Sequence, residues 1–278
     1  MFAGNKALIV SKHGKEKVIA PLFQQSLGIT CIVSENFDTD LLGTFTGEVE
    51  RASDSLTTAV KKVSLGLELY NHDLGIANEG SFGPHPNIPF IPCDEEIMIF
   101  MDRKHNLQIT ERILSAETNF SAAEIQNEDD LMQFATGAMF PTHALIIREN
   151  KDDKHGIIKG ITDWEYLLQS FHQMKKNHGM VHVETDMRAM YNPTRMSVIE
   201  QLTERLINKI NSRCPSCHTP GFGVIEVKSG LPCKQCGSPT RSILINFLRC
   251  EKCLFQKEEM YPHHKTVEDA MYCDFCNP

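Results

Sequence analysis

The stretch DLGIANEGSFGPHPNIPF, residues 73–90, organises the first half of the chain. Its apolar run 74–77 is typical of a buried strand, and open α/β sheets bind ligands where such strands end. The strand is expected to end at Asn-Glu-Gly, and a loop containing glycines and prolines follows. We expect this stiffened loop to present His85, with Glu79 in a ligand or metal site. The alternative is that Asn-Glu-Gly only forms a turn.

Outward from this stretch, apolar runs of strand length alternate with segments that have helical spacing. The expected strands are 7–10, 30–33, 74–77, 97–101, 107–114, 143–147, 157–161 and 180–184. The expected helices are 18–27, 53–70, 128–138, 163–176 and one that begins after Asn192. Gly28 suits the end of the first helix, and Asn192 with Pro193 suits the start of the last. The alternation predicts an α/β class: a mixed or mostly parallel sheet flanked by helices.

Composition places the chain among ordinary globular proteins. It has 278 residues, of which 41% are hydrophobic and 23% are charged. No apolar run approaches the ~18 residues that a membrane span needs, and no signal-peptide pattern opens the sequence. We therefore expect a cytoplasmic protein without a membrane partner.

Charge is unevenly distributed along the chain, whose net charge is −8. From Arg213 onward there are 8 Lys and Arg against 7 Asp and Glu, whereas the preceding part has 20 against 29. An acidic body repels a phosphate backbone, so it is not expected to bind nucleic acid non-specifically. A small anionic ligand, held through a metal or local arginines, remains compatible with this charge.

Eight of the ten cysteines form four C-x-x-C pairs near the C-terminus, which indicates metal binding. The pairs are Cys214/Cys217, Cys233/Cys236, Cys250/Cys253 and Cys273/Cys276, with 15, 13 and 19 residues between successive pairs. This spacing favours a tandem zinc ribbon over 213–278, with two structural zinc ions, after an α/β domain over 1–212. We expect the first pair to join the second, around a hairpin in GFGVIEVKSG, and the third to join the fourth. A crossed arrangement, first with third and second with fourth, is the alternative.

The remaining cysteines and the nearby histidines have simpler interpretations. Cys31 and Cys93 stand in apolar surroundings and are expected to be small core residues. His218, His263 and His264 could each replace a thiolate, but eight cysteines already suffice for two sites, so surface positions are favoured.

Two further polar segments flank the first two predicted helices. SKHGKE, residues 11–16, follows the first strand, and Lys12 or Lys15 at a helix start could bind phosphate. Solvated lysines at a helix start are the alternative. DTDLLGTFTGEVER, residues 38–51, is an acidic loop whose carboxylates could also be simple helix-start charges.

The segment VETDMRAMYNPTR precedes the last helix of the body. Glu184 or Asp186 could hold a hard cation, while Arg188 and Arg195 could hold a phosphate. The alternative is a salt-bridge network that links the body to the cysteine module.

The motifs SKHGKE, DTDLLGTFTGEVER, ANEGSFGPHP, ETDMRAMYNPTRM and GLPCKQCGSPT…CNP resemble those of a bacterial family of domains of unknown function with a C-terminal tandem zinc ribbon. The resemblance covers nearly the whole chain and implies no activity. Residues 6–105 are also similar to the inosine/xanthosine triphosphate pyrophosphatases. That likeness implies that Lys15 binds phosphate and Glu79 binds the metal. His13 departs from the asparagine usual there, and the PHP loop has no counterpart.

Together these features favour a Mg²⁺- or Mn²⁺-dependent hydrolase of a phosphate-containing small molecule such as a nucleotide. Glu79, with Asp186 or Glu184, would hold the cation, and Lys15 and Arg188 would hold the phosphate. His85 would act as general acid or base. The alternative is a non-enzymatic protein whose zinc ribbons recognise a protein or RNA partner.

Overall fold

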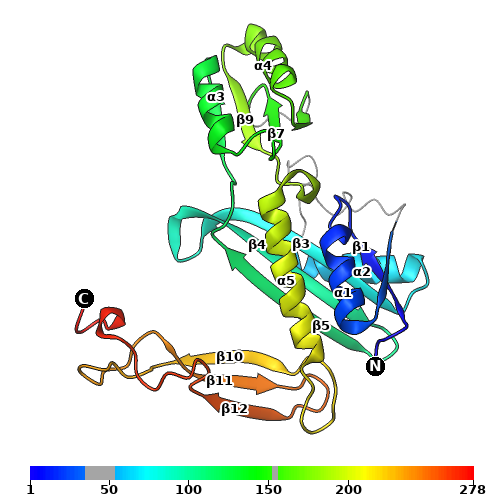
Figure 1. Cartoon of the computed structure of the whole chain (residues 1–278), viewed down its shortest axis with the longest axis vertical. Coiled ribbons are helices and arrows are strands. Elements are labelled where there is room, and N and C mark those ends of the chain that lie inside the picture. Colours follow the sequence, from blue (N-terminus) through cyan, green and yellow to red (C-terminus); the bar gives the residue numbers. More distant parts are fainter. Residues whose placement is uncertain (35–53, 152–155) are drawn as a thin grey trace. The chain divides into compact units, whose positions relative to one another are not determined.

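The chain folds into two compact units, Met1–Ile207 and Asn208–Pro278 (Figure 1). The structure is a computed structural model that describes residues 1–34, 54–151 and 156–278. The acidic segment 38–51 lies outside the described residues. Among the described residues, no helix combines the length and the apolar character needed to cross a membrane.

The first unit opens with a mixed five-stranded sheet in the order β2-β1-β3-β4-β5. Strands β1 (Lys6–Val10), β2 (Thr30–Val33) and β3 (Leu74–His85) are mutually parallel. Strands β4 (Ile88–Asp102) and β5 (Leu107–Ser115) continue the sheet in antiparallel fashion. This sheet and its helices confirm the predicted α/β class.

Helices α1 (Glu16–Leu27) and α2 (Ser55–Leu69) connect the three parallel strands. Gly28 ends α1 in the left-handed conformation, at φ 64°, as its position in the sequence predicts. Asp54 caps α2 by accepting a hydrogen bond from Thr57 N at 3.0 Å. The apolar stripe of α2 packs on one sheet face in a cluster of buried residues: Leu8, Val10, Ala59, Val63, Leu67, Ala77 and Ile99.

The prediction that a strand ends at Ala77 and a loop follows is wrong. β3 continues to His85 and pairs with β4 over its whole length, so the glycines and prolines lie within a long hairpin. Pro84 lies opposite Pro92, and the register shifts directly after it. Proline is tolerated there because irregular positions near a hairpin end need fewer ladder N–H donors.

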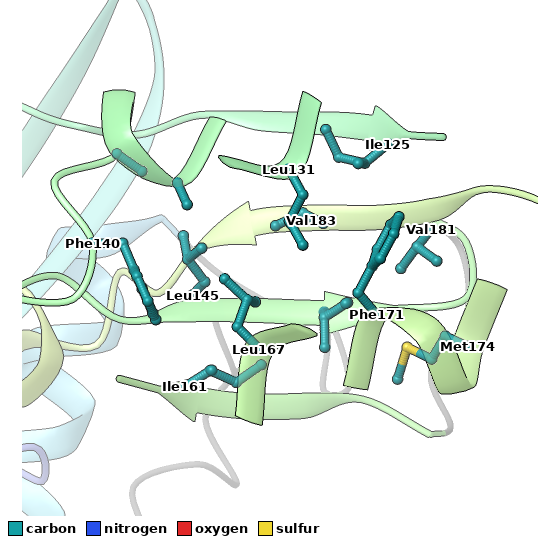
Figure 2. Packing of buried hydrophobic residues seen from close by; sticks show 13 residues of the cluster. Ile125, Leu131, Phe140, Leu145, Ile161, Leu167, Phe171, Met174, Val181 and Val183 are labelled. Carbon is teal, nitrogen blue, oxygen red and sulfur yellow. The ribbon is translucent and has the colours of Figure 1, made fainter. Parts of the chain in front are cut away.

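The first unit contains a second sheet where a single sheet was expected. It is antiparallel throughout, in the order β6-β9-β7-β8. Its strands are β6 (Ala122–Ile125), β7 (Leu145–Arg148), β8 (Ile158–Ile161) and β9 (Val181–Thr185), and its helices are α3 (Glu128–Gly137) and α4 (Trp164–His178). Figure 2 shows the buried side chains between these helices and the sheet, including Leu131, Phe140, Leu167, Phe171 and Val183.

Helix α5 (Pro193–Asn211) follows a short 3₁₀ helix, η2 (Ala189–Tyr191). The Asn192 side chain caps α5 by accepting from Arg195 N at 2.9 Å, which confirms the predicted start. The apolar stripe of α5 is buried: Val198, Ile199, Leu202, Leu206 and Ile210. Thr203 lies 3.7 Å from the sulfur of Met98, which places α5 on the sheet face opposite α2.

The second unit has a three-stranded antiparallel sheet, β10 (Gly223–Ser229), β11 (Ile243–Arg249) and β12 (Gln256–Met260), in that order. A 3₁₀ turn, η3 (Ala270–Tyr272), precedes the last cysteine pair. All residues of β12 are exposed, and β12 forms one edge of the sheet. GFGVIEVKSG therefore forms one strand of a hairpin and not a hairpin by itself.

Candidate functional site

Two groups of four cysteines lie in the second unit, and within each group the sulfur atoms are within 4.8 Å of one another. One group is Cys214, Cys217, Cys250 and Cys253, and the other is Cys233, Cys236, Cys273 and Cys276. Sulfur–sulfur distances across pairs are 3.6 Å in the first group. In the second group they are 3.6 and 3.9 Å. Disulfides would need ~2.05 Å, whereas a tetrahedral site with metal–sulfur bonds of ~2.3 Å separates its sulfurs by ~3.8 Å.

The same backbone turn presents all four cysteine pairs. In each pair the residue after the second cysteine donates its N–H to the carbonyl oxygen of the first, at 2.9 Å. In three of the pairs that residue has a positive φ: 60° at His218, 73° at Gly237 and 59° at Leu254. The turn holds both thiols of a pair together, so each pair can supply two ligands to one ion. His218, His263 and His264 are exposed and outside both groups, as predicted.

Hydroxyl groups next to the tetrads favour thiolates. The Thr219 hydroxyl lies 3.2 Å from the sulfur of Cys217, and this contact lowers the pKa of Cys217 to about 6. A hydrogen bond from Ser238 likewise lowers the pKa of Cys236 to about 6. The hydrogen bond with Cys236, in contrast, raises the pKa of Cys276 to about 12, so a soft or borderline cation that binds four thiolates would release protons.

The favoured sequential pairing of the cysteine pairs is wrong, and the crossed alternative is correct. Strand β10 separates the first pair from the second, and seven extended residues span ~20 Å. Because β10 and β11 are antiparallel, with Gly223 opposite Arg249, the first and third pairs meet at the same end of this hairpin. The number of residues between the first and second cysteine pairs suggested that this segment forms a complete hairpin. In the structure it forms the single strand β10, which pairs with β11.

A second group of interacting charged side chains lies in the first unit, beside the carboxyl end of β1 and the middle of β3. Glu79 is buried, and Lys62 Nζ of α2 donates to its Oε1 at 2.8 Å. Lys15, at the start of α1, is also buried and donates from Nζ to the carbonyl oxygen of Asn78 at 3.1 Å. Two lysine side chains, one from each helix, therefore contact adjacent residues of β3.

The opposite face of β3 carries a second buried ion pair. Arg195 of α5 donates from Nε to Glu96 Oε1 of β4 at 2.6 Å, and both side chains are fully buried. Gly80 lies directly across from Glu96 in the β3–β4 register. A Cβ on Gly80 would lie 2.4 Å from Glu96 Oε1 and 2.5 Å from Arg195 Nη2. Glycine is required here because it leaves room for the ion pair.

Burial and crowding shift the pKa of two members of this cluster toward neutrality. Burial, followed by the positive charge of Arg195, lowers the pKa of Lys15 to about 7. Burial, followed by the negative charge of Glu96, raises the pKa of Asp94 to about 8. Such perturbed groups occur in functional sites, where burial and neighbouring charges are used to tune protonation.

A cavity of about 150 Å³ lies near the cluster within the same unit. It is lined by Phe82, Phe120, Ile146 and residues 184–188. Asp186 is fully buried and accepts hydrogen bonds from Arg188 Nε and Nη2, at 3.0 and 2.6 Å to Oδ1 and Oδ2. Glu184 forms an ion pair with Arg148. The last polar segment thus builds the wall of a cavity, and its carboxylates are paired with arginines.

The structure brings some of the predicted site residues together and separates others. Glu79, Lys15 and Arg195 belong to one cluster, since the charges of Glu79 and Arg195 both act on Lys15. Asp186, Arg188 and Glu184 line the neighbouring cavity. Lys12 lies half-buried in the turn before α1. Within residues 1–34, 54–151 and 156–278, only the two cysteine groups place three or more His, Cys, Asp or Glu ligand atoms together.

His85 does not join the cluster. It lies at the tip of the β3–β4 hairpin, where its Nδ1 accepts from Asn87 N at 3.2 Å. It lies six positions beyond Glu79 along an extended strand, a distance of ~20 Å. A hairpin was not expected in this stretch, and of the two prolines that suggested a presented histidine, Pro84 lies in a hairpin strand and Pro86 in the turn.

Three cluster residues were missed by sequence analysis: Lys62, Asp94 and Glu96. Each had a signal, since Lys62 lies beside Ala59 and Val63 on the apolar stripe of a predicted helix. Asp94 and Glu96 alternate at two-residue spacing just before the apolar run of a predicted strand. A charged residue at a position that the pattern assigns to the interior is itself evidence for a buried polar site.

The fold and its sites define a protein with a mixed α/β unit and a small module built around two cysteine tetrads. The model of the family described as domain of unknown function (DUF6671) matches residues 62–278, and the chain belongs to this family. No curated protein matches the chain. The family match confirms the resemblance to a domain of unknown function, and its description assigns no activity.

Proposed function

We propose that residues 208–278 bind two zinc ions, each through four cysteine thiolates, and that both ions are structural. The observation that supports this most directly is the set of sulfur–sulfur distances, 3.6 to 3.9 Å, which fits the edges of a tetrahedral thiolate site. Four protein ligands leave no open position for a substrate, so the ions would stabilise the fold.

The small apolar core of this unit supports the same role. Its buried cluster consists of Cys214, Phe222 and Cys250, with Leu248 packed against them. A module of this size with so few buried apolar side chains needs another source of stability, and metal binding supplies it.

Metal analysis of paired cysteine variants tests both the stoichiometry and the crossed arrangement. The wild type should contain two zinc ions per chain. Cys217→Ser/Cys250→Ser removes two ligands from one tetrad and should retain one ion, whereas Cys217→Ser/Cys236→Ser should retain none. Sequential pairing would reverse these results. Cys31→Ser, a half-buried cysteine of the first unit, is the control and should retain both ions.

The second candidate function is hydrolysis of a phosphate-containing small molecule by the first unit, with Mg²⁺ or Mn²⁺ held by carboxylates of the buried cluster. It is favoured by the convergence of Lys15, Lys62 and Arg195 with Glu79 and Glu96 beside the end of β1. Lys15 at the start of α1 would contact the phosphate, and the cation would offset the charge on its oxygens. In this arrangement His85 takes no part.

A turnover screen over nucleotides and simple phosphate esters, with Mg²⁺ and with Mn²⁺, tests this candidate. Glu79→Gln and Lys15→Met should each lower the rate by at least ~100-fold. Glu95→Gln is the matched control, because Glu95 lies on β4 in an ion pair with Arg112 and outside the cluster. Rates equal in all four proteins would exclude the cluster as the active site. Absence of turnover would favour the non-enzymatic alternative, in which the cysteine module binds a protein or RNA partner.

A further inference from the structure

The face of the second sheet that points away from α3 and α4 carries a carboxylate beside the cavity. Leu145 and Val183 belong to the core between the helices and the sheet (Figure 2). Ile146 and Glu184 alternate with these residues and lie directly opposite each other in the β7–β9 register. Opposed residues project to the same side of a sheet, so both side chains lie on the other face. Both residues line the cavity, which therefore lies over that face.

The remaining side chains of the cavity include a mainly apolar wall. Phe82 and Phe120 supply two aromatic rings, whose centroids are 5.7 Å apart, and Met187 adds a thioether. The cavity volume is about 150 Å³. A cavity of similar volume with aliphatic and aromatic walls holds one benzene ring, so this space suits one six-membered ring.

Each carboxylate of the cavity lining has an arginine partner. Glu184 pairs with Arg148 through Oε1, and Asp186 pairs with Arg188. Asp186 also accepts a hydrogen bond from Gly160 N at 3.0 Å, so both of its oxygens are occupied within the protein. Because the two charge pairs cancel, the cavity suits a neutral group better than an ion.

Glu184 keeps hydrogen-bonding capacity that Asp186 lacks. Its Oε2 lies 3.6 Å from His182 Nε2, which is longer than a hydrogen bond. A carboxylate offers several lone pairs on its two oxygens, so the contact of Oε1 with Arg148 still leaves acceptor sites. Glu184 can therefore accept neighbouring N–H groups from a ligand in the cavity.

We propose that this cavity binds a guanine-type base, a flat neutral ring whose edge carries an N–H and an N–H₂ group side by side. The six-membered ring would lie against Phe82 and Phe120, with its two donor groups directed at Glu184. Enzymes read an unstacked base in this way, through hydrogen bonds to its pairing edge and contacts with aromatic or apolar side chains. Adenine carries an acceptor nitrogen on that edge, which a carboxylate repels.

This site deepens the hydrolase candidate by naming a guanine nucleotide as the substrate, and that use rests on the hydrolase proposal. Phe82 joins the cavity to the buried cluster, because the guanidinium of Arg195 lies over its ring at 5.1 Å from the centroid. Binding of the base itself requires neither turnover nor a bound cation.

Isothermal titration calorimetry of the full-length, zinc-loaded chain without added Mg²⁺ tests the site. GMP, AMP and ribose phosphate are the probes, because all three carry a phosphate and only the base differs. GMP should bind at least ~10-fold more tightly than AMP, since a polar site rejects a ligand that leaves its groups unpaired. Ribose phosphate should bind more weakly than GMP by a similar factor.

Two substitutions with matched controls assign the binding to the cavity. Glu184→Gln replaces an acceptor oxygen by an N–H₂ group and should weaken GMP binding at least ~10-fold. Glu165→Gln, at an exposed position of α4, should bind GMP like the wild type. Phe120→Ala removes an aromatic wall and should weaken binding at least ~5-fold. Phe90→Ala, 85% exposed and outside the cavity lining, should leave it unchanged.

Nuclear magnetic resonance of the wild type covers the case in which Glu184→Gln does not fold because Arg148 loses its partner. Addition of GMP should shift the amide signals of residues 120, 146 and 184–188 before those of the rest of the chain. Shifts confined to other residues would place the nucleotide elsewhere and overturn the site.

The outcomes distinguish the site from the hydrolase candidate. GMP binding that depends on Glu184, without turnover of any phosphate compound, keeps the site and removes the hydrolase. Turnover with no Glu184-dependent GMP binding keeps the hydrolase and overturns the site. Equal affinities for GMP and AMP, or no GMP binding at all, also overturn it.

Discussion

The absence of a Cβ at Gly80 leaves the space in which Glu96 and Arg195 form their ion pair. Any Cβ at this position would overlap Glu96 Oε1 at 2.4 Å. Arg195 and Glu96 are fully buried, so displacing either leaves a charge without its partner, which typically costs 3–5 kcal/mol. The glycine of Asn-Glu-Gly therefore serves packing around a charge pair, and no turn occurs there.

Substitution of this glycine is expected to destabilise the first unit. Gly80→Ala should lower the free energy of unfolding by about 3 kcal/mol. Gly83→Ala is the matched control on the same strand, because nothing lies within 4 Å of its Cβ position, and it should change stability by less than ~0.5 kcal/mol. Urea unfolding followed by fluorescence of Trp164, the single tryptophan, measures both. Equal effects at the two glycines would contradict the packing argument.

Lys15 should make stability depend on pH in a defined direction. Its pKa falls from 10.5 to about 7 in the fold, so the unfolded chain binds the proton more tightly. The free energy of unfolding therefore rises as pH increases from about 7 to 10.5, because the unfolded chain still holds the Lys15 proton in this range and the folded chain does not. Below pH 7 the folded protein carries the buried charge and bears its whole energetic cost. Lys15→Met removes that cost.

We expect Lys15→Met to unfold at higher urea concentration than the wild type at pH 6, by on the order of 4 kcal/mol. The difference should shrink steadily between pH 7 and pH 10. Lys61→Met, at an exposed position of α2, is the control and should show no such trend. A constant difference across this range would mean that Lys15 is not neutralised by the fold.

Among single residues, the sequence identified the polar positions better than their roles. Glu79, Lys15 and Arg195 were singled out because they belong to unusual polar motifs, and the structure places them in one buried cluster. Their partners could not be predicted, because Lys62–Glu79 and Glu96–Arg195 join different elements. Local spacing carries no information about which helix face meets which strand. The metal and catalytic roles of Glu79, Asp186 and His85 therefore stay predictions.

At the scale of elements, helix ends and short parallel strands were predictable and long antiparallel ones were not. Gly28, Asn192 and Pro193 mark helix boundaries through local backbone chemistry, and these boundaries agree with the structure. β3 was cut short because glycine and proline usually stop a strand, whereas pairing with β4 carries it to His85. Tertiary pairing overrides local preference in such hairpins.

Helix α4 offers a test of the second sheet's core. Phe171 is fully buried between α4 and the antiparallel sheet (Figure 2). Phe171→Ala should lower the free energy of unfolding by about 3–5 kcal/mol, because a large cavity replaces the ring. Tyr166, on the same helix but 50% exposed, is the control, and Tyr166→Ala should cost less than ~1 kcal/mol. Similar costs for both would show that α4 is not anchored through Phe171.

At the scale of the whole molecule, the sequence predicted the fold class and the number of cysteine sites but not their connectivity. The spacing between cysteine pairs is nearly the same for a complete hairpin and for one strand with its turns. The choice depends on β11 returning beside β10, which is a non-local pairing. For the same reason the two sheets of the first unit could not be separated from one alternating pattern of strands and helices.

Metal removal should affect the two units differently. A strong zinc chelator should abolish the amide hydrogen-exchange protection of β10 and β11, because the second unit has little apolar core without its ions. Fluorescence of Trp164 and the urea midpoint of the first unit should not change. Protection that persists after two equivalents of zinc have been released would show that the module folds without metal.

The exposed strand β12 has a consequence for how molecules of this protein behave toward one another. Its outer backbone N–H and C=O groups form an open sheet edge, which could template the addition of a strand from another chain. Lys257, Glu258 and Glu259 place exposed charged side chains along that edge. An incoming strand would have to crowd and dehydrate these groups, so growth of the sheet into fibrils is opposed at β12 by residues that add nothing to the core.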